Sequence, residues 1–381
     1  MKIDELRRPA PEQSLTEGAR IVHPEDAVFT DGIPGAQRAI AELEKMTQGK
    51  EVTTIKWDGF PALVFGRNVD GELIVADKHM FDKKDGSGRV TSPDAFKQYD
   101  INRGANRSDL YAKVDLLWPA LESIIPGGFR GFYMGDLLYA GRLQPQDGFF
   151  VFKPNTVTYR VNANSNTGKK IAASVAGIAV HTFFPGVGEG DQPLSGLGGL
   201  PDTGNPIWFV SGEMPVPKVQ MDKTALDTAK KTVAQYSSAV TDVIAKLTQM
   251  KAKGVVTNIS PYITSKISSG SFDHMLDGYY TFIASKLSPG AATTLLGDKQ
   301  NGFLYTEGRP GLEGIFAIWV AVYNLKLNIK QQIDAQAGAG DIQAYTGSDP
   351  GHEGYVVGGG EDKMKLIDRL GFSRANFAKN G

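Results

Sequence analysis

Residues 51–66 read EVTTIKWDGFPALVFG, and this stretch decides which fold we expect. Residues 51–56 are rich in β-branched side chains and predict a strand that ends at the tetrapeptide KWDG, residues 56–59. Residues 60–66 and 72–77 predict two further strands joined by a tight hairpin. The stretch therefore predicts an antiparallel, β-rich region with a lysine at the end of a strand.

Working outward, helices and strands alternate in the first half of the chain and helices dominate later. Helical spacing of apolar residues predicts helices, and runs of apolar and β-branched residues predict strands. The predicted helices are Gly35–Gln48, Ser108–Ile125, Thr167–Val175, Thr224–Lys253, Phe272–Leu287 and Gly311–Gln336. The further predicted strands are Phe129–Tyr139, Gly148–Lys153, Thr156–Val161, Ile178–Phe184, Glu353–Val357 and Lys363–Asp368.

This order predicts an α+β fold in which a helical module interrupts a β-rich domain. We expect residues 1–215 and 346–381 to form that domain and residues 216–345 to form the helical insertion. A glycine-rich stretch at 186–204 is typical of a surface loop, because it does not stand between a clear strand and a helix.

Composition narrows the function classes. The chain has 381 residues, 41% of them hydrophobic and 22% charged, and a formal net charge of −1, so nucleic acid would need a local basic patch. There are no cysteines, which excludes disulfides and thiolate sites and agrees with a cytoplasmic location. We find no apolar run near 18 residues, so a membrane partner is not expected. A monomer is the expected oligomeric state.

Lys56 is the candidate nucleophile. A neutral lysine amine can attack the α-phosphorus of ATP and expel pyrophosphate. A free lysine is almost wholly protonated at neutral pH, so nearby cations are needed to favour its neutral form. Asp58 and Gly59 fit a tight turn that would hold the amine in place.

Three later patterns could supply the rest of a nucleotide site. Asp136, on a predicted aromatic-rich strand, and Glu353, before a buried strand, could hold a divalent metal. Lys363 and Lys365 would project from the same face of a strand and could neutralise phosphate charge. Each pattern alone is also compatible with an ordinary surface or strand-end residue, but together they follow one order on predicted strands.

That order resembles the covalent nucleotidyltransferase superfamily of ATP-dependent polynucleotide ligases, particularly RNA ligases. The resemblance implies an antiparallel β-rich nucleotidyltransferase core of the ATP-grasp-like adenylation type. It implies that Lys56 accepts AMP, that Asp136 and Glu353 bind Mg²⁺ or Mn²⁺, and that Lys363 and Lys365 contact ATP. The stretches FKPNTVTY and FSRANF also resemble proteins of tailed phages, which implies the cytoplasm of an infected bacterial host.

By the same resemblance, the residues that contact the nucleotide are Thr54, Ile55, Asp58, Gly59, Arg67 and Phe183. Phe183 is the candidate ring for stacking on the purine, although its stretch is equally typical of a core strand. The chain departs from the family at Thr54, where many relatives have glutamate, and at Pro61, where many have arginine. Arg67 is the nearest downstream substitute. These departures make the base contacts less secure than the nucleophile.

The implied function is ATP-dependent joining of 5′-phosphate and 3′-hydroxyl nucleic-acid ends through a lysyl-AMP intermediate. Only residues 366–381 follow Lys365, so we expect no C-terminal OB domain, which favours RNA over DNA as the substrate. The alternatives are a nick-sealing DNA ligase and a non-catalytic phage protein that binds nucleic acid on the same fold. Lysines of the helical insertion could grip the substrate or could belong to a solvated face: Lys218, Lys223, Lys230, Lys231, Lys246, Lys251 and Lys253.

Overall fold

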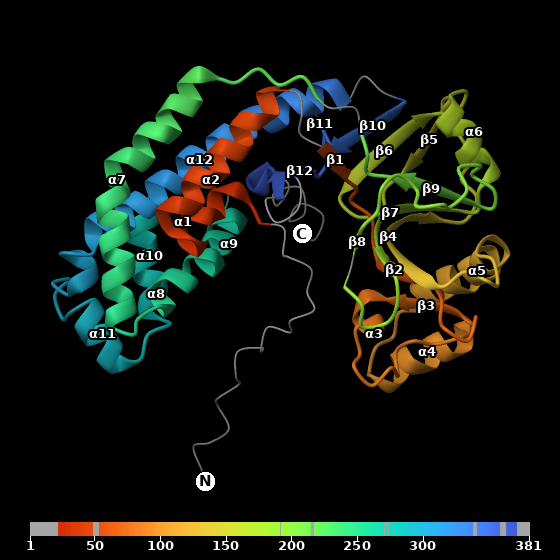
Figure 1. The fold of residues 1–381 in the computed structure, drawn as a ribbon, viewed down its shortest axis with the longest axis horizontal. Coiled ribbons are helices and arrows are strands. Elements are labelled where there is room, and N and C mark those ends of the chain that lie inside the picture. The colour runs from red at the N-terminus through yellow and green to blue at the C-terminus, as the bar shows by residue number, and fades with distance from the viewer. Residues whose placement is uncertain are drawn as a thin grey trace, which may run out of the picture. The chain divides into compact units, whose positions relative to one another are not determined.

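The structure is a computed structural model that describes residues 22–48, 53–190, 192–214, 217–269, 272, 274–337, 341–358 and 363–371. Helices combine with mainly antiparallel sheets, so the predicted α+β class is confirmed. The described chain forms two compact units (Figure 1). Unit 1 contains Pro61–Arg142 and Ala173–Ser211, and unit 2 contains Ile21–Phe60, Leu143–Ala172 and the chain from Gly212 onward.

Unit 1 is built on one sheet whose strand order is β3-β2-β4-β7-β8, with β9 paired parallel to β7. The strands are β2 (Ala62–Arg67), β3 (Leu73–Asp77), β4 (Gly131–Ala140), β7 (Ala176–Phe184), β8 (Gln192–Pro193) and β9 (Ile207–Ser211). Its helices are α3 (Lys78–Phe81), α4 (Pro93–Asn102) and α5 (Ser108–Ile124).

The core of unit 1 forms where α5 packs on the sheet. Leu110, Val114, Leu117 and Leu121 follow helical spacing along α5, and all are buried in one cluster with the strands. The predicted hairpin between β2 and β3 is confirmed, and its register places Leu63 opposite Asp77 and Arg67 opposite Leu73.

Unit 2 contains the long helices. They are η2 (Pro24–Asp26), α1 (Ala27–Thr30), α2 (Gly32–Lys45), η3 (Met46–Gln48), α6 (Asn166–Ala173), α7 (Lys223–Gln249), α8 (Gly254–Thr257), α9 (Ile259–Ser269), α10 (Met275–Ala284), α11 (Pro289–Leu295), η4 (Phe303–Tyr305) and α12 (Arg309–Ala337). The α12 helix and the α7 helix run side by side (Figure 1).

The packing of α12 on α7 depends on small residues. A Cβ atom at Gly311 would lie 2.5 Å from the carbonyl oxygen of Ala239, so a larger residue would push the helices apart. The rest of α12 presents an apolar stripe that includes Trp319, Val322 and Ile329, all buried. By length and composition α12 could cross a membrane, but most of its apolar stretch is buried, which is also typical of a core helix.

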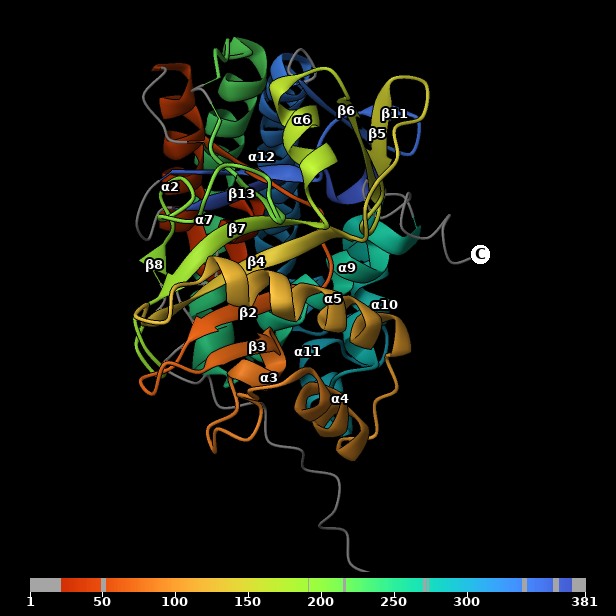
Figure 2. The same cartoon turned by 90° about the vertical axis from the view of Figure 1, so that its right-hand side faces the viewer.

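Unit 2 also contains two sheets. The first has the strand order β1-β12-β13, from β1 (Thr53–Lys56), β12 (Gly354–Val357) and β13 (Met364–Ile367). The second has the order β11-β10-β6-β5, from β5 (Phe149–Phe152), β6 (Val157–Asn162), β10 (Ile342–Thr346) and β11 (Asp349–Pro350). Figure 2 shows β5 and β6 beside α6.

The helices and the first sheet share one core. Buried residues of α7 and α12 belong to the same cluster as Tyr355, Val357 and Leu366 of β12 and β13. The boundaries of the two compact units differ from those of the domains that we expected. The expected domains were residues 1–215 with 346–381, and residues 216–345.

Most predicted elements are present within a few residues of their expected ends. The sequence analysis did not predict α4, α9, α11, β9 or β10, and it placed a loop where the short β8 lies. The two strands predicted at Glu353–Val357 and Lys363–Asp368 are present as β12 and β13, which pair antiparallel, and residues 359–362 between them lie outside the described residues. The phage-like stretch FSRANF, residues 372–377, also lies outside them.

Candidate active site

Lys56 lies at the end of β1, in the sheet that joins this part of the chain to the distant β12–β13 hairpin. β1 pairs antiparallel with β12, and Lys56 is directly opposite Gly354. A Cβ atom at Gly354 would lie 2.5 Å from the carbonyl oxygen of Leu366 on β13, so glycine is needed there. Because Glu353 comes immediately before this glycine, the close strand pairing holds its carboxylate at the end of β1.

The Nζ of Lys56 forms a hydrogen-bonded ion pair with Oε2 of Glu353. The Glu353 side chain is 9% exposed, whereas the Lys56 side chain is 33% exposed. Burial raises the pKa of Glu353, while the positive charges of Lys56 and Lys365 lower it. Lys56, Glu353 and Lys365, which the sequence analysis proposed as parts of one site, are therefore close enough to interact.

Asp58 anchors the KWDG tetrapeptide to the turn between β5 and β6. Its carboxylate accepts hydrogen bonds from the backbone N–H groups of Thr156 and Val157 and from the side-chain amide of Asn155. The backbone N–H of Asp58 donates to the Tyr159 hydroxyl over 2.8 Å. The tetrapeptide is thus held by long-range hydrogen bonds, whereas residues 57–59 do not form the tight turn that we expected. Asp58 therefore acts as a positioning residue.

The sequence analysis missed an aromatic cluster that lies beside Lys56. The Trp57 ring lies 5.0 Å from the Tyr159 ring and 6.0 Å from the His352 ring. His352 is buried, which lowers its pKa to about 4, and its Nδ1 has no hydrogen-bond partner among the described residues. The sequence did contain a signal for this cluster. Trp57 directly follows Lys56 and His352 directly precedes Glu353, so an aromatic side chain stands next to each member of the proposed pair.

The remaining predicted residues of unit 2 have simpler environments. The Thr54 hydroxyl is 3.5 Å from the carbonyl oxygen of Val356, and the Ile55 N–H donates to the carbonyl of Gly212. Gly59 lies in neither a helix nor a strand. Lys363 precedes β13 and is half-buried, and no ion pair involves it among the described residues. Of the lysine pair, Lys365 is one of the groups that lower the pKa of Glu353.

Three predicted residues belong to unit 1. Asp136 lies on β4, and its carboxylate is 3.8 Å from Nε2 of His181 on the neighbouring β7. Phe183 packs in the hydrophobic core against Tyr133, with ring centroids 5.5 Å apart, as the core-strand alternative expected. Arg67 is buried and donates to the carbonyl oxygens of Ile125 and Gly71. Arg67 therefore has a structural role at the C-terminal end of α5.

The chain matches the model of a known protein family. Residues 19–380 match the model of a family of unknown function, DUF6267. The chain belongs to this family. No curated protein and no solved structure matches it.

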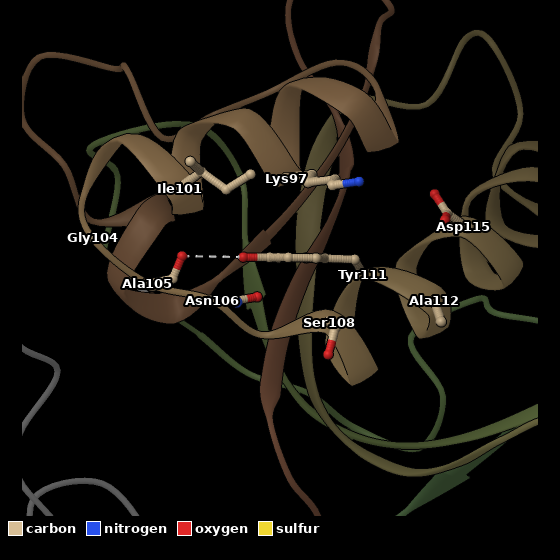
Figure 3. Close-up of a pocket in the computed structure, with 9 residues that line it drawn as sticks. All are labelled: Lys97, Ile101, Gly104, Ala105, Asn106, Ser108, Tyr111, Ala112 and Asp115. Carbon is tan, nitrogen blue, oxygen red and sulfur yellow. Dashed lines mark hydrogen bonds between the residues drawn. The ribbon is translucent and has the colours of Figure 1, made fainter.

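This member of DUF6267 also has a shallow pocket in unit 1, between α4 and α5. Its volume is about 690 Å³, and Lys97, Tyr111 and Asp115 are among its lining residues (Figure 3). The Tyr111 hydroxyl points toward the carbonyl oxygen of Ala105 and also donates to the buried Asp100. The lining contains none of the residues proposed from the sequence, so this pocket gives no support to the nucleotide site.

The arrangement around Lys56 is suited to nucleophilic chemistry in this DUF6267 protein. A partly exposed amine is held by a buried carboxylate, and a second lysine lies within electrostatic range. Among the described residues, no group of three or more His, Cys, Asp or Glu side chains could hold a metal ion by itself. A metal would therefore need additional ligands, such as nucleotide phosphates and water.

Proposed function

We propose that this protein is an ATP-dependent polynucleotide ligase that forms a covalent lysyl-AMP at Lys56. The observation that carries the proposal is the ion pair between Lys56 and Glu353. Its two residues are 297 positions apart in the sequence, and they belong to the ordered set that resembles nucleotidyltransferases. The Lys56 amine is accessible to a ligand, and the carboxylate beside it can accept the proton that the amine must lose before it attacks.

The first step would join Lys56 to AMP. The neutral amine attacks the α-phosphorus of ATP, an N–P bond forms, the bond to the bridging oxygen breaks, and pyrophosphate leaves. The ammonium form must first lose a proton, and the Glu353 carboxylate is its direct hydrogen-bond partner. The raised pKa of Glu353 supports this role, because it makes the carboxylate a better proton acceptor.

Lys365 and Asp58 would assist without reacting. Lys365 adds positive charge near the carboxylate and could stabilise the negative charge of the α-phosphate. Asp58 holds the Lys56 backbone against the β5–β6 turn. Mg²⁺ or Mn²⁺, bound with ATP, would offset phosphate charge. Glu353 remains a predicted metal ligand in unit 2, and none of the proposed steps depends on Asp136, which belongs to unit 1.

The later steps would transfer AMP to a 5′-phosphate end and then let a 3′-hydroxyl attack that end and release AMP. RNA is our preferred substrate, and nicked DNA is the alternative. End-joining assays with single-stranded RNA, nicked RNA and nicked DNA would distinguish these substrates.

The decisive experiment uses ATP labelled at the α-phosphate. We expect label that survives denaturation in the wild type and in Lys246→Ala, a matched change at an exposed lysine of α7. We expect no label in Lys56→Ala or in Lys56→Arg, since guanidinium keeps the charge but stays protonated. The proposal fails if wild-type protein takes no label from ATP or GTP, or if Lys56→Ala is labelled normally.

A further inference from the structure

The outward face of the β11-β10-β6-β5 sheet differs in character from its inward face. Phe150 and Phe152 of β5 and Tyr159 and Val161 of β6 are buried on the inward side. The alternate residues along the same strands are half-buried or exposed, as expected for a sheet covered on one side. The outward strand positions are Phe149, Val151, Thr158, Arg160, Asn162, Gln343 and Tyr345.

Strand pairing places several of these side chains next to one another. Arg160 lies between Val151 of β5 and Gln343 of β10 in one row across the sheet. Thr158 is directly opposite Tyr345 in the neighbouring row. The Tyr345 hydroxyl donates to the Gln343 side chain over 3.1 Å, which fixes both groups on this face. Two rings, a guanidinium and three hydrogen-bonding side chains therefore share one surface.

Arg160 is the distinctive member of this surface. Its guanidinium lies over the Phe149 ring, 4.4 Å from the ring centroid. Most described arginines donate to carboxylates or carbonyls, as Arg103, Arg107 and Arg369 do. Arg160 has no hydrogen bond or ion pair with any described residue, so its N–H groups remain available to a ligand.

Arg160 is the charged residue among the outward strand positions, which include no carboxylate. The exposed Lys153 directly follows β5. Carboxylates flank the two ends of the sheet: Asp341 precedes β10 at one end, and Asp349 of β11 pairs with Thr346 at the other. A bound anionic chain would therefore lie over Arg160, between these two ends.

We propose that this outward sheet face binds single-stranded RNA. Exposed bases stack on aromatic rings and on arginine planes, and basic side chains neutralise the phosphates. Tyr345 and the Phe149–Arg160 pair supply the stacking surfaces, and Arg160 and Lys153 supply the charge. Gln343, Thr158 and Asn162 can donate to and accept from 2′-hydroxyl groups, which is why RNA is favoured over DNA. The inference deepens the proposed ligase function by naming its substrate, and in that sense rests on it.

Binding can be measured without ATP, so this test is separate from the lysyl-AMP assay. The probe is a fluorescein-labelled unstructured RNA of about ten nucleotides, followed by anisotropy. We expect Tyr345→Ala and Arg160→Gln each to weaken binding about tenfold, and Arg160→Gln to reduce the salt dependence. Arg142→Gln removes the same charge from an exposed residue of unit 1 and should change binding less than about twofold.

Several results would overturn this inference. They are absence of RNA binding by the wild type, equal weakening by Arg142→Gln, and equally tight binding of the matched single-stranded DNA or of duplex RNA. Thermal unfolding of each variant identifies loss of fold, and Lys153→Gln provides a second variant outside the strands. Arg160→Gln should still accept label from ATP. Failure of one proposal therefore leaves the other open to its own test.

Discussion

Two of the lysine–glutamate pairs in unit 2 have surroundings that differ sharply. Lys326 and Glu25 are both completely buried, and Nζ of Lys326 lies 2.6 Å from Oε1 of Glu25. In the other pair, Glu353 is nearly buried but Lys56 is one-third exposed. The same two residue types thus form a closed pair in one place and a pair that a ligand can reach in the other.

The closed pair belongs to a network that joins the two ends of the described chain. Arg369 donates to Asp26, the Trp319 indole donates to the same carboxylate, and Tyr323 donates to Asp368. Burial raises the pKa of Glu25 and lowers that of Lys326. Every charged group there has a protein partner, so the network acts on stability. The open pair has the features of a reactive site because its lysine is accessible.

The largest expected effect comes from breaking the closed pair. Lys326→Met should reduce the free energy of unfolding by about 3–5 kcal/mol, because the buried Glu25 would lose its hydrogen-bonded cation and keep only Arg369 at 3.7 Å. The double variant Glu25→Leu/Lys326→Met should recover most of this loss, since no isolated charge is left. Urea unfolding measures both values. Additive losses in the double variant would contradict this account of the pair.

The next effect concerns the carboxylate of the open pair. Glu353→Gln should slow formation of lysyl-AMP by about 100-fold, because the partner that accepts the Lys56 proton is gone. Its unfolding free energy should change by less than about 1 kcal/mol, since Lys56 remains hydrated. Glu313→Gln is a suitable control, because it removes a carboxylate from an exposed ion pair with Arg309.

The pH dependence of that variant tests the role of Glu353 separately from its contribution to structure. In the wild type, the rate of lysyl-AMP formation should fall as pH drops through the pKa of Glu353, which burial raises above its ordinary value. Glu353→Gln should lack this acid limb. The same acid limb in both proteins would contradict a proton-accepting role.

The closed pair and the open pair each have a buried histidine beside them. These two histidines predict that the stability of the fold decreases in acid. Burial lowers the pKa of His352 from 6.5 to about 4, and that of His23 to about 2. As pH falls below 6.5, the unfolded chain binds protons that the folded chain does not, so stability decreases. His352→Phe should remove about 2 kcal/mol of the stability difference between pH 7 and pH 5. An unchanged difference, measured by urea unfolding, would contradict the buried, neutral state of His352.

The smallest expected effect comes from the anchor of the open pair. Asp58→Asn keeps the size of the side chain but cannot accept all the hydrogen bonds from residues 155–157. We expect a loss of about 1–2 kcal/mol in the unfolding free energy and a smaller decrease in lysyl-AMP formation than for Glu353→Gln. A larger decrease for Asp58→Asn would mean that Asp58 contributes more than position.

Local patterns in the sequence predicted much of this fold. The apolar spacing along α7 and α12 and the β-branched residues of β1 were enough to place these elements. The α+β class followed from their order. Long-range pairing was harder to predict, because β10 pairs with β6 from far along the chain and no local pattern specifies that partner. The hydrogen bonds from the β5–β6 turn to Asp58 were missed for the same reason.

The candidate site shows the same division. The order of Lys56, Glu353 and Lys365 along predicted strands is enough to assign them to one candidate site from the sequence. The closed pair was missed because Lys326 and Glu25 look like ordinary polar residues. One signal was available: Lys326 lies seven residues after Trp319 and three before Ile329, on the buried stripe of α12. A charged residue at a core position indicates a buried partner, but only the fold identifies Glu25.

The central claim is that Lys56, the accessible lysine of the two pairs, becomes covalently attached to AMP. The most direct measurement is mass spectrometry of peptides from protein incubated with ATP and Mg²⁺. We predict an AMP adduct on the peptide that contains Lys56 and none on the peptide that contains Lys326. An unmodified Lys56 peptide under these conditions, or an adduct at another lysine that persists in Lys56→Ala, would contradict the account.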